Sequence, residues 1–137
     1  MVSKVLERPR MNGQDDLRYN TPAYWWIREA DKLPSTDEAW AEEDFLCRVK
    51  LFGGAWTWYI AGYDPERHVA VGLVDGFEVE SGDIDMTELA ETRIPVTLHV
   101  GDASAREPLK FGIPIERDLY WTPKRESELR RELGRVS

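Results

Sequence analysis

The alternation of apolar and polar residues is clearest between Arg48 and Asp85, and the remainder of the chain is organised around this segment. It contains three short stretches that favour tight turns, at Gly53-Gly54, Asp64-Pro65 and Asp75-Gly76. The runs between these turns are rich in aromatic and β-branched residues, which favour strands. The segment is therefore predicted to fold as an antiparallel meander, with each strand paired to the next.

Period-two spacing assigns faces to these strands, because alternate residues of a strand point to the same side. Residues 45–52 should begin the sheet, and residues 68–74, which are apolar on both faces, should form a central strand. After the third turn, Phe77 is predicted to face inward together with Val79. In the strand after the first turn, one face carries Trp56, Trp58 and Ile60 and the other carries Thr57 and Tyr59.

Two helices are predicted before the meander. Thr21-Pro22 is a favourable helix start, so a short helix is expected to run from there to about Asp31. Ser35 or Thr36, followed by a run of acidic residues, predicts a second helix. Carboxylates in the first turn stabilise the positive end of the helix dipole, which supports this second assignment.

A third helix and a further strand are predicted after the meander. Asp85 is a suitable N-cap, and Ile84 and Leu89 are spaced to pack against each other as a hydrophobic staple. Residues 94–100 then alternate apolar and polar side chains and predict a strand. Pro95 places that strand at the edge of a sheet, because proline cannot donate a backbone hydrogen bond.

These patterns predict a single α+β domain over residues 21–133. Its core would be an antiparallel sheet of about four to six strands, with short helices packed on one face. A last helix should begin at Thr122-Pro123 and end at Gly134. Residues 1–20 are polar and are predicted to form a flexible N-terminal arm, with residues 134–137 as a short tail.

The charge of the chain narrows the possible partners. The protein has 137 residues and a formal net charge of −8, and its basic residues are enriched at the two ends. An acidic body repels nucleic acid at long range and attracts basic surfaces. No apolar run approaches the roughly 20 residues of a membrane helix, and the N-terminus lacks the apolar centre of a signal peptide. A cytoplasmic protein without a membrane partner is therefore expected.

Few residues in the chain suggest metal, cofactor or nucleophilic chemistry. Cys47 is the single cysteine and lies in an apolar run, where it is expected to be a small core residue. His68 and His99 are the only histidines, too few for a zinc cluster of nitrogen and sulfur ligands. The glycines match no phosphate-binding loop. We therefore expect no metal and no cofactor, and we assign no catalytic residue.

Acidic residues that lie close to aromatic ones are the best candidates for a partner-binding surface. Five acids fall between residues 37 and 44 without an intervening base, and further acids follow between residues 75 and 91. Such a surface could compete for a site that normally binds phosphate, or it could serve only solubility. The tentative partner-binding residues are Asp37, Glu38, Trp40, Glu42, Glu43, Asp44, Glu78 and Glu80.

A second cluster of polar and aromatic residues lies near the C-terminus. An arginine between two acids can form a bidentate pair, and it can stack on a neighbouring aromatic ring. The cluster could pin its segment to the sheet through a partly buried ion pair, or it could contact a ligand. Its members are Glu116, Arg117, Asp118, Tyr120 and Trp121.

Two other classes of function stay open from the residues alone. A nucleic-acid-binding module could use Arg48, Lys50 and the basic ends of the chain for the phosphates. The bases of the bound nucleic acid would stack on a platform of aromatic side chains, made of Trp56, Trp58, Tyr59, Tyr120 and Trp121. An enzyme of unknown reaction could instead use a pair of carboxylates around Glu116 and Asp118, because paired carboxylates can act as acid and base.

Several segments of the chain, taken in order, resemble a known family. They are VKLF, the strand AWTW, YDPE, GLVDG with the following EVESG, an acid-capped helix, and GIPIERDLYWTPK. Over roughly residues 46–93 and 111–125 the chain resembles a family of small uncharacterised proteins of phages, plasmids and integrative elements. In that family the capped helix is followed closely by the GIPIERD-like segment, whereas here residues 94–110 come between them.

The resemblance implies an origin on a mobile element and an accessory role, often beside genes that counter host defence. It supplies no activity and no catalytic residues. Combined with the acidic charge, it leads to the expectation of a non-enzymatic protein that binds a host macromolecule, with a host protein as the expected partner. The nucleic-acid-binding and carboxylate-enzyme hypotheses are the alternatives.

Overall fold

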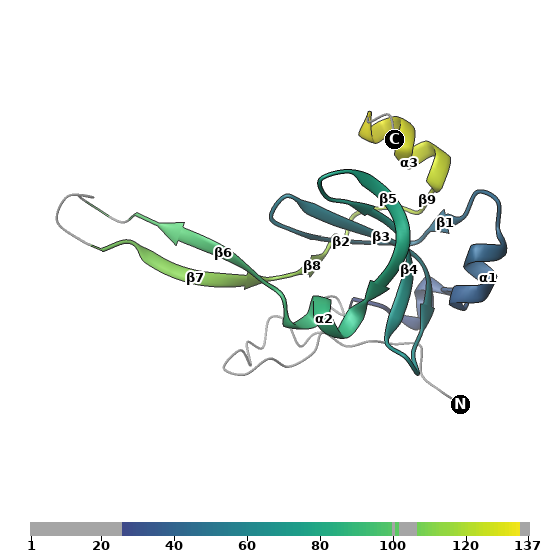
Figure 1. Ribbon diagram of the computed structural model, residues 1–137, viewed down its shortest axis with the longest axis horizontal. Helices are drawn as coiled ribbons and strands as arrows, with labels where there is room; N and C mark the ends of the chain where they lie inside the picture. The colour runs from purple at the N-terminus through teal and green to yellow at the C-terminus, as the bar shows by residue number, and fades with distance from the viewer. Residues whose placement is uncertain (1–25, 100, 102–106, 135–137) are drawn as a thin grey trace.

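The computed structural model describes residues 26–99, 101 and 107–134, and its central element is a five-stranded antiparallel sheet (Figure 1). The predicted N-terminal arm, residues 1–20, and tail residues 135–137 lie outside this range. The strand order is β5-β4-β3-β2-β8. The strands are β2 (Val49–Gly53), β3 (Trp56–Asp64), β4 (Val69–Asp75), β5 (Val79–Asp85) and β8 (Glu116–Arg117). The predicted α+β class and the meander from β2 to β5 are confirmed.

The predicted turns join these strands. Gly53 pairs with Trp56, so a two-residue loop connects β2 to β3, and Gly54 adopts the positive φ of 58° that glycine tolerates. In the second turn Asp64 Oδ1 accepts hydrogen bonds from the backbone N–H groups of Glu66 and Arg67, at 2.9 and 3.3 Å. These contacts fix the register of the meander.

The inward orientation predicted for Phe77 is wrong. Its side chain is 91% exposed, whereas Val79 is 4% exposed as expected. The physical reason is that residues 76–78 form the connection between β4 and β5, so that strand alternation begins only at Val79. Phe77 instead lies against Trp56, a contact that becomes important for the site described below.

The sheet is covered on both faces, which corrects the prediction that the helices pack on one face. Neighbouring residues of β3 belong to different cores, with Ile60 in the first core and Tyr59 in the second. The helix α2 (Met86–Glu91) covers the first core together with Trp26 and Ile27. The helices α1 (Thr36–Ala41) and α3 (Glu126–Leu133) cover the second. Because β3 and β4 are apolar on both sides, each face needs a cover.

The helix starts at α1 and α2 are confirmed. At α1 the Ser35 side chain accepts a hydrogen bond from Glu38 N–H, and the Glu38 carboxylate accepts one from Ser35 N–H. At α2 Asp85 is the N-cap, and Ile84 and Leu89 are both buried in the first core, as the staple predicts. Local sequence signals fix both of these ends.

The first predicted helix is wrong in its described part. Residues 26–28 are not helical, and only a 3-10 turn, η3 (Glu29–Asp31), follows them. Trp26 and Ile27 are both buried although they are consecutive, and Trp26 Nε1 donates to the Ile115 carbonyl oxygen at 3.2 Å. These tertiary contacts outweigh local helix propensity at residues 26–28, and the predicted helix start at residues 21–22 lies outside the described range.

The last helix begins later than predicted. The residues before Glu126 form a short strand, β9 (Lys124–Arg125), which pairs with β1 (Leu46–Cys47). The backbone N–H of Glu126 then donates to the Phe45 carbonyl oxygen at 2.9 Å. This pairing explains why Thr122-Pro123 is not the helix start, while the predicted stop at Gly134 is confirmed by its positive φ of 66°.

A separate two-stranded sheet projects from the body. It consists of β6 (Arg93–Leu98) and β7 (Leu109–Pro114), which pair antiparallel and extend away from the five-stranded sheet (Figure 1). We call it the projecting hairpin. The strand predicted at residues 94–100 is therefore present over most of its length, and among the described strands it pairs with β7 alone.

Candidate functional site

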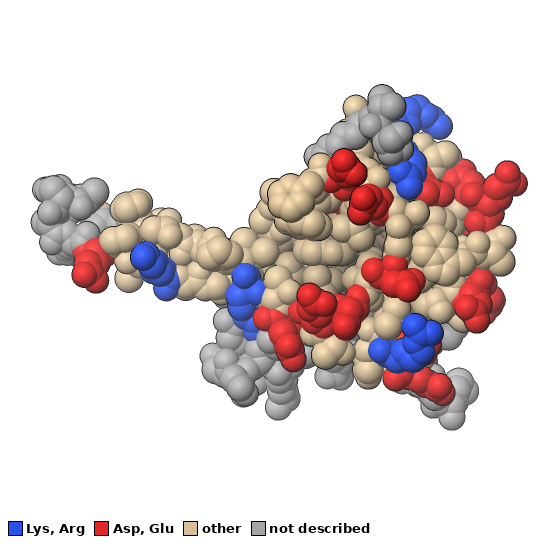
Figure 2. Space-filling view, viewed as in Figure 1, with Lys and Arg blue, Asp and Glu red and all other residues tan. Residues whose placement is uncertain are grey.

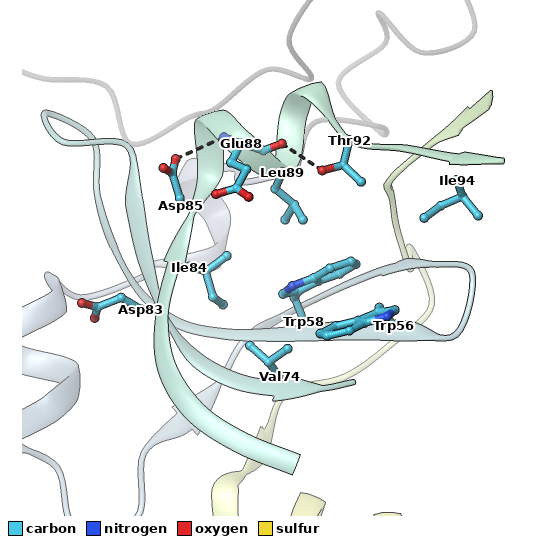
Figure 3. A pocket seen from close by; sticks show the side chains of 10 residues that line it. All are labelled: Trp56, Trp58, Val74, Asp83, Ile84, Asp85, Glu88, Leu89, Thr92 and Ile94. Atoms are coloured by element: carbon cyan, nitrogen blue, oxygen red, sulfur yellow. Dashed lines mark hydrogen bonds between the residues drawn. The ribbon is translucent and has the colours of Figure 1, made fainter. Parts of the chain in front are cut away.

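The candidate site is a cleft between the sheet and α2, and we call it the tryptophan cleft (Figure 3). It measures about 460 Å³, within the range of typical small-molecule and side-chain pockets. Its apolar floor comes from β3, β4 and β5, its roof from α2, and its outer end from the first residues of β6. The lining residues are Trp56, Trp58, Val74, Asp83, Ile84, Asp85, Glu88, Leu89, Thr92 and Ile94.

Two stacked indole rings form the most distinctive wall of the cleft. The rings of Trp56 and Trp58 lie 6.2 Å apart between centroids and are tilted by only 22°. Alternation along β3 places them on the same face, as predicted from the sequence. Phe77 meets Trp56 edge to face at 5.3 Å. Gly76 makes this packing possible, because a Cβ at that position would collide with the Trp56 ring.

Three carboxylates border the cleft: Asp83 and Asp85 lie on β5, and Glu88 lies on helix α2. Asp85 Oδ1 accepts hydrogen bonds from Thr87 N–H and Glu88 N–H, at 3.0 and 3.1 Å, which fixes the first turn of the helix. Thr92 Oγ1 donates to the Glu88 carbonyl oxygen at 2.9 Å and fixes the last turn. Figure 3 shows Glu88 and Leu89 pointing from the helix toward the indoles, whereas the Asp83 carboxylate points away from them. Glu88 is thus the acid best placed for a bound group.

A smaller cleft of about 230 Å³ adjoins the first one. It is lined by Trp56, Val74, Phe77, Glu78 and Glu80, so Trp56 and Val74 contribute to both clefts. Glu78 and Glu80 were among the predicted partner-binding residues, and the structure places them beside an exposed aromatic ring. The two clefts together form an acidic, aromatic surface on one side of the sheet.

The other predicted partner-binding residues lie on α1 or in the three residues after it, and α1 packs on the opposite face of the sheet. Several of them have structural partners. Glu38 belongs to the capping box, and Glu42 pairs with Arg125 at 3.5 Å. Asp44 accepts hydrogen bonds from Ser127 N–H at 2.9 Å and Ser127 Oγ at 2.6 Å, which hold the pKa of Asp44 below its usual value.

The remaining predicted partner-binding residues near α1 are Asp37, Trp40 and Glu43. Trp40 is 43% exposed and meets Phe45 edge to face at 5.9 Å, so it anchors the end of α1 only in part. Asp37 and Glu43 are exposed at the surface. The acidic residues of α1 therefore do not join those of the tryptophan cleft, and the predicted set falls into two separate groups.

The C-terminal cluster is held mainly by structural contacts. Arg117 forms a bidentate pair with Asp31, with Nη1–Oδ2 and Nη2–Oδ1 distances of 2.7 Å, and Nη1 also donates to the Trp26 carbonyl oxygen at 3.0 Å. Both side chains are nearly buried. The partner of Arg117 is thus neither Glu116 nor Asp118. The pair ties β8 to the segment before α1, in line with the structural interpretation of this cluster.

The rest of that cluster does not form a common site. Asp118 pairs with Lys50 at 3.6 Å and accepts a hydrogen bond from Tyr120 N–H at 3.0 Å. Tyr120 is 93% exposed, while Trp121 packs on Tyr59 at 5.5 Å between ring centroids. Neither cleft described above is lined by Glu116 or Asp118, the carboxylates of the enzyme hypothesis.

The proposed stacking platform is also divided by the sheet. Tyr59 lies in the second core, while Trp58 packs against the first core on the opposite face. Of its basic residues, Lys50 pairs with Asp118, and Arg48 Nη1 donates to the Asp31 carbonyl oxygen at 3.4 Å. The aromatic rings of the nucleic-acid hypothesis therefore do not face one groove.

Three observations concern the Cys47 thiol, metal binding and membrane-spanning helices. Cys47 is fully buried in the second core, and this burial raises the pKa of its thiol to about 12. Among the described residues, no group of three or more His, Cys, Asp and Glu side chains is arranged to hold a metal ion. In the same part of the chain, no helix has the length and apolar character to cross a membrane.

Sequence reasoning missed Leu89 and Ile94 as members of the site, and it placed Glu88 only within the general group of acids between residues 75 and 91. The hydrophobic staple between Ile84 and Leu89 could have indicated the position of Leu89, because it fixes α2 over the face of β5 that holds Ile84. Trp58 packs against the same core, so α2 lies on the face of the sheet that carries the indoles.

Comparison of the chain with protein-family models, curated proteins and solved structures found no match.

Proposed function

We propose that this protein is a non-enzymatic binding protein that holds a basic segment of a partner protein in the tryptophan cleft. The stacked pair Trp56–Trp58 facing the carboxylate of Glu88 is the observation that carries the proposal. An aromatic wall opposite an acid suits a ligand that is apolar along its stem and positively charged at its end. Lysine and arginine side chains have this form.

The energetics favour such a ligand. A cation within about 6 Å of an indole centroid gains roughly 0.5 to 2 kcal/mol, depending on how far it is desolvated. The apolar floor of the cleft, which includes Val74 and Leu89, accepts the methylene groups of the stem. Glu88 can then pair with the charged end. Glu78 and Glu80 in the adjoining cleft add negative potential that raises the local concentration of basic ligands.

The wider role in this proposal comes from the sequence. The net charge of −8 supports a basic partner and disfavours nucleic acid. The resemblance over residues 46–93 and 111–125 supports an accessory protein of a phage or another mobile element. On that basis the partner is a host protein, bound in the course of host takeover or counter-defence.

An array of defined peptides tests the proposal without knowledge of the partner. The full chain is applied to peptides that carry lysine or arginine among apolar residues, and to matched peptides with glutamine at the charged positions. Binding is expected only to the basic peptides. The Glu88→Gln variant should bind them about two- to fivefold more weakly, because it loses an exposed charge pair but keeps the shape of the cleft.

Two further variants locate the binding surface. Trp56→Leu should weaken binding by a similar factor, since it removes one indole from the stacked pair. Glu43→Gln is the matched control, because it removes the same charge from the opposite side of the sheet and should leave affinity unchanged. Equal loss from Glu43→Gln and Glu88→Gln, or binding of single-stranded DNA in place of peptides, would refute the proposal.

A further inference from the structure

The five-stranded sheet ends on one side in a long and regular strand. β5 (Val79–Asp85) closes the strand order β5-β4-β3-β2-β8 and has seven residues, whereas β8 at the other end has two. The register between β5 and β4 shows no bulge, and β5 contains neither proline nor lysine. Bulges, proline and lysine are common features that prevent an exposed edge from pairing with another chain. β5 lacks them, so its edge can accept a further strand.

Two hydrogen bonds at the ends of the β4–β5 pairing show which backbone groups face this edge. Gly76 N–H donates to the Glu78 carbonyl oxygen at 3.1 Å, and Met86 N–H donates to the His68 carbonyl oxygen at 2.9 Å. Both bonds continue the register of β4 with β5. Bonded and non-bonded pairs alternate along an antiparallel ladder. The even-numbered residues of β5 are therefore bonded to β4, and the odd-numbered residues direct their N–H and C=O groups outward.

Ser81 and Asp83 are the odd-numbered residues at the centre of this edge. Both are exposed, and in the described part of the chain no hydrogen bond reaches their outward backbone groups. At Val79 the carbonyl oxygen already accepts a hydrogen bond from Arg130 Nη1 at 3.4 Å, so the open part of the edge begins at Ser81. Ser81 and Asp83 each offer one N–H and one C=O to a strand placed alongside.

This edge adjoins the tryptophan cleft. Alternation places the even-numbered residues of β5 on the face of Ile84, which lines the cleft. Gly82 lies on that face, and a Cβ at Gly82 would have no atom within 4 Å, so the space beside it is open. Glu80 lies on the same face and lines the adjoining smaller cleft. Side chains of an added strand that share this face can therefore reach both clefts.

The charges along the edge select a basic strand. β5 has exposed acids on both faces, Glu80 on the cleft face and Asp83 on the other, and it contains no basic residue. Glu88 on α2 adds a further carboxylate beside the cleft. Figure 2 shows acidic side chains gathered over the part of the body where Figure 1 places β5 and α2. A second copy of β5 would bring like charges together, so these acids disfavour pairing between two copies.

We infer that β5 binds the partner's basic segment as an additional strand, with lysine or arginine at every second position. The inference rests on the proposed function and adds the conformation in which the segment binds. Backbone hydrogen bonds to Ser81 and Asp83 hold the segment in register. Its alternate side chains enter the tryptophan cleft beside Glu88 and the smaller cleft beside Glu80. A helical segment would leave the backbone groups of β5 unused, because its own N–H and C=O groups bond internally.

N-methylated peptides test the added strand. The probe is a peptide of alternating lysine and valine with the length of β5, titrated against the full chain and followed by tryptophan fluorescence. Copies in which one backbone N–H is replaced by N–CH3 are titrated alongside. Affinity should fall at least about tenfold for methylation at every second position, whose N–H faces β5, and change by less than about twofold at the positions between. Equal losses at all positions would overturn this inference and leave the proposed function standing, whereas a full chain that binds no basic peptide would refute both.

A proline on β5 tests the same contact from the side of the protein. Ser81→Pro removes an outward N–H that β4 does not use, so thermal unfolding should show a folded protein. The alternating peptide should bind this variant at least about tenfold more weakly than the wild type. Ser81→Ala keeps the N–H and is the control, with an affinity within about twofold of the wild type. Equal affinity of the folded Ser81→Pro variant and the wild type would overturn the added strand, and the N-methylated series decides the question if this variant does not fold.

Discussion

At the scale of single residues, the protein separates buried groups that stabilise the fold from exposed groups that can bind. Cys47 and Arg117 are buried and structural, although either could be mistaken for a reactive or ligand-binding residue in the sequence. Arg117 lies 86 positions from Asp31, and no local pattern connects them. Sequence reasoning could predict that Arg117 forms a bidentate pair, but only the tertiary structure identifies its partner.

Removing Arg117 should strongly destabilise the fold. Arg117→Met leaves the Asp31 carboxylate buried without its partner, and breaking a buried ion pair in this way costs about 3 to 5 kcal/mol of unfolding free energy. Lys50→Met is the control, because the Lys50–Asp118 pair is longer and more exposed and is worth about 0 to 1 kcal/mol. Urea denaturation measures both values, and similar losses for the two variants would contradict this interpretation.

Cys47 should make the protein less stable in alkaline solution. Its pKa is about 12 in the folded protein against 9.0 for an unperturbed thiol, mainly because of burial. The folded state therefore retains the proton longer, so the stabilisation is complete below pH 9 and is lost as the pH rises toward 12. At pH 10.5 the loss is about 2 kcal/mol relative to pH 8.

The Cys47→Ala variant separates this effect from that of the tyrosines. Burial also raises the pKa values of Tyr59 and Tyr63, and these groups weaken the fold above pH 10 in both proteins. Urea denaturation at pH 8 and pH 10.5 should show a smaller loss of unfolding free energy for the variant. An equal loss would mean that Cys47 does not contribute.

At the scale of elements, the turns and helix caps were predictable because a few adjacent residues determine them. Gly53-Gly54, Ser35 and Asp85 each act within one turn of their own position. The errors concern segments whose structure depends on distant partners. Trp26 bonds to Ile115, and β9 pairs with β1, so the predicted helices do not extend over residues 26–28 or over residues 124–125.

A pair of glycines facing each other in the sheet provides a matched test of packing. Gly72 on β4 is the register partner of Gly82 on β5. A Cβ at Gly72 would collide with the backbone carbonyl oxygen of Tyr59, while a Cβ at Gly82 would meet no atom within 4 Å. Gly72→Ala should therefore destabilise the fold by at least about 1 to 3 kcal/mol.

The partner substitution should act in the opposite direction. Gly82→Ala reduces the freedom of the unfolded chain without a clash and should stabilise the fold by about 0.5 to 1 kcal/mol. Thermal unfolding of the two variants alongside the wild type checks both signs. A destabilised Gly82→Ala protein would show that β5 has less room at this position than the structure describes.

At the scale of the whole molecule, the projecting hairpin is attached to a body that has its own two cores. The sequence predicted the strand at residues 94–100 but not its separation from the main sheet, because alternation does not reveal which strand is the partner. The same limit applies to the tryptophan cleft. The face of Trp56 and Trp58 was predictable, whereas its cover by α2 follows from the long-range fold.

Shortening the hairpin should leave the body folded. Replacing residues 97–110 by an Asn-Gly turn keeps the inner pairs, including Ile94 with Ile113, and removes the outer part. Because the outer residues lie outside both cores, the unfolding temperature should change by only about 4 °C or less. Differential scanning calorimetry measures this change, and a loss of the cooperative transition would contradict the separation of hairpin and body.

The stacking of Trp56 on Trp58 also gives the protein an optical property. Two nearly parallel indoles with centroids 6.2 Å apart couple their electronic transitions, which produces a paired band in the ultraviolet circular dichroism spectrum. This signal depends on the relative orientation of the two rings. A ligand that binds between the rings and α2 will therefore change this circular dichroism signal, so binding can be followed without an attached dye.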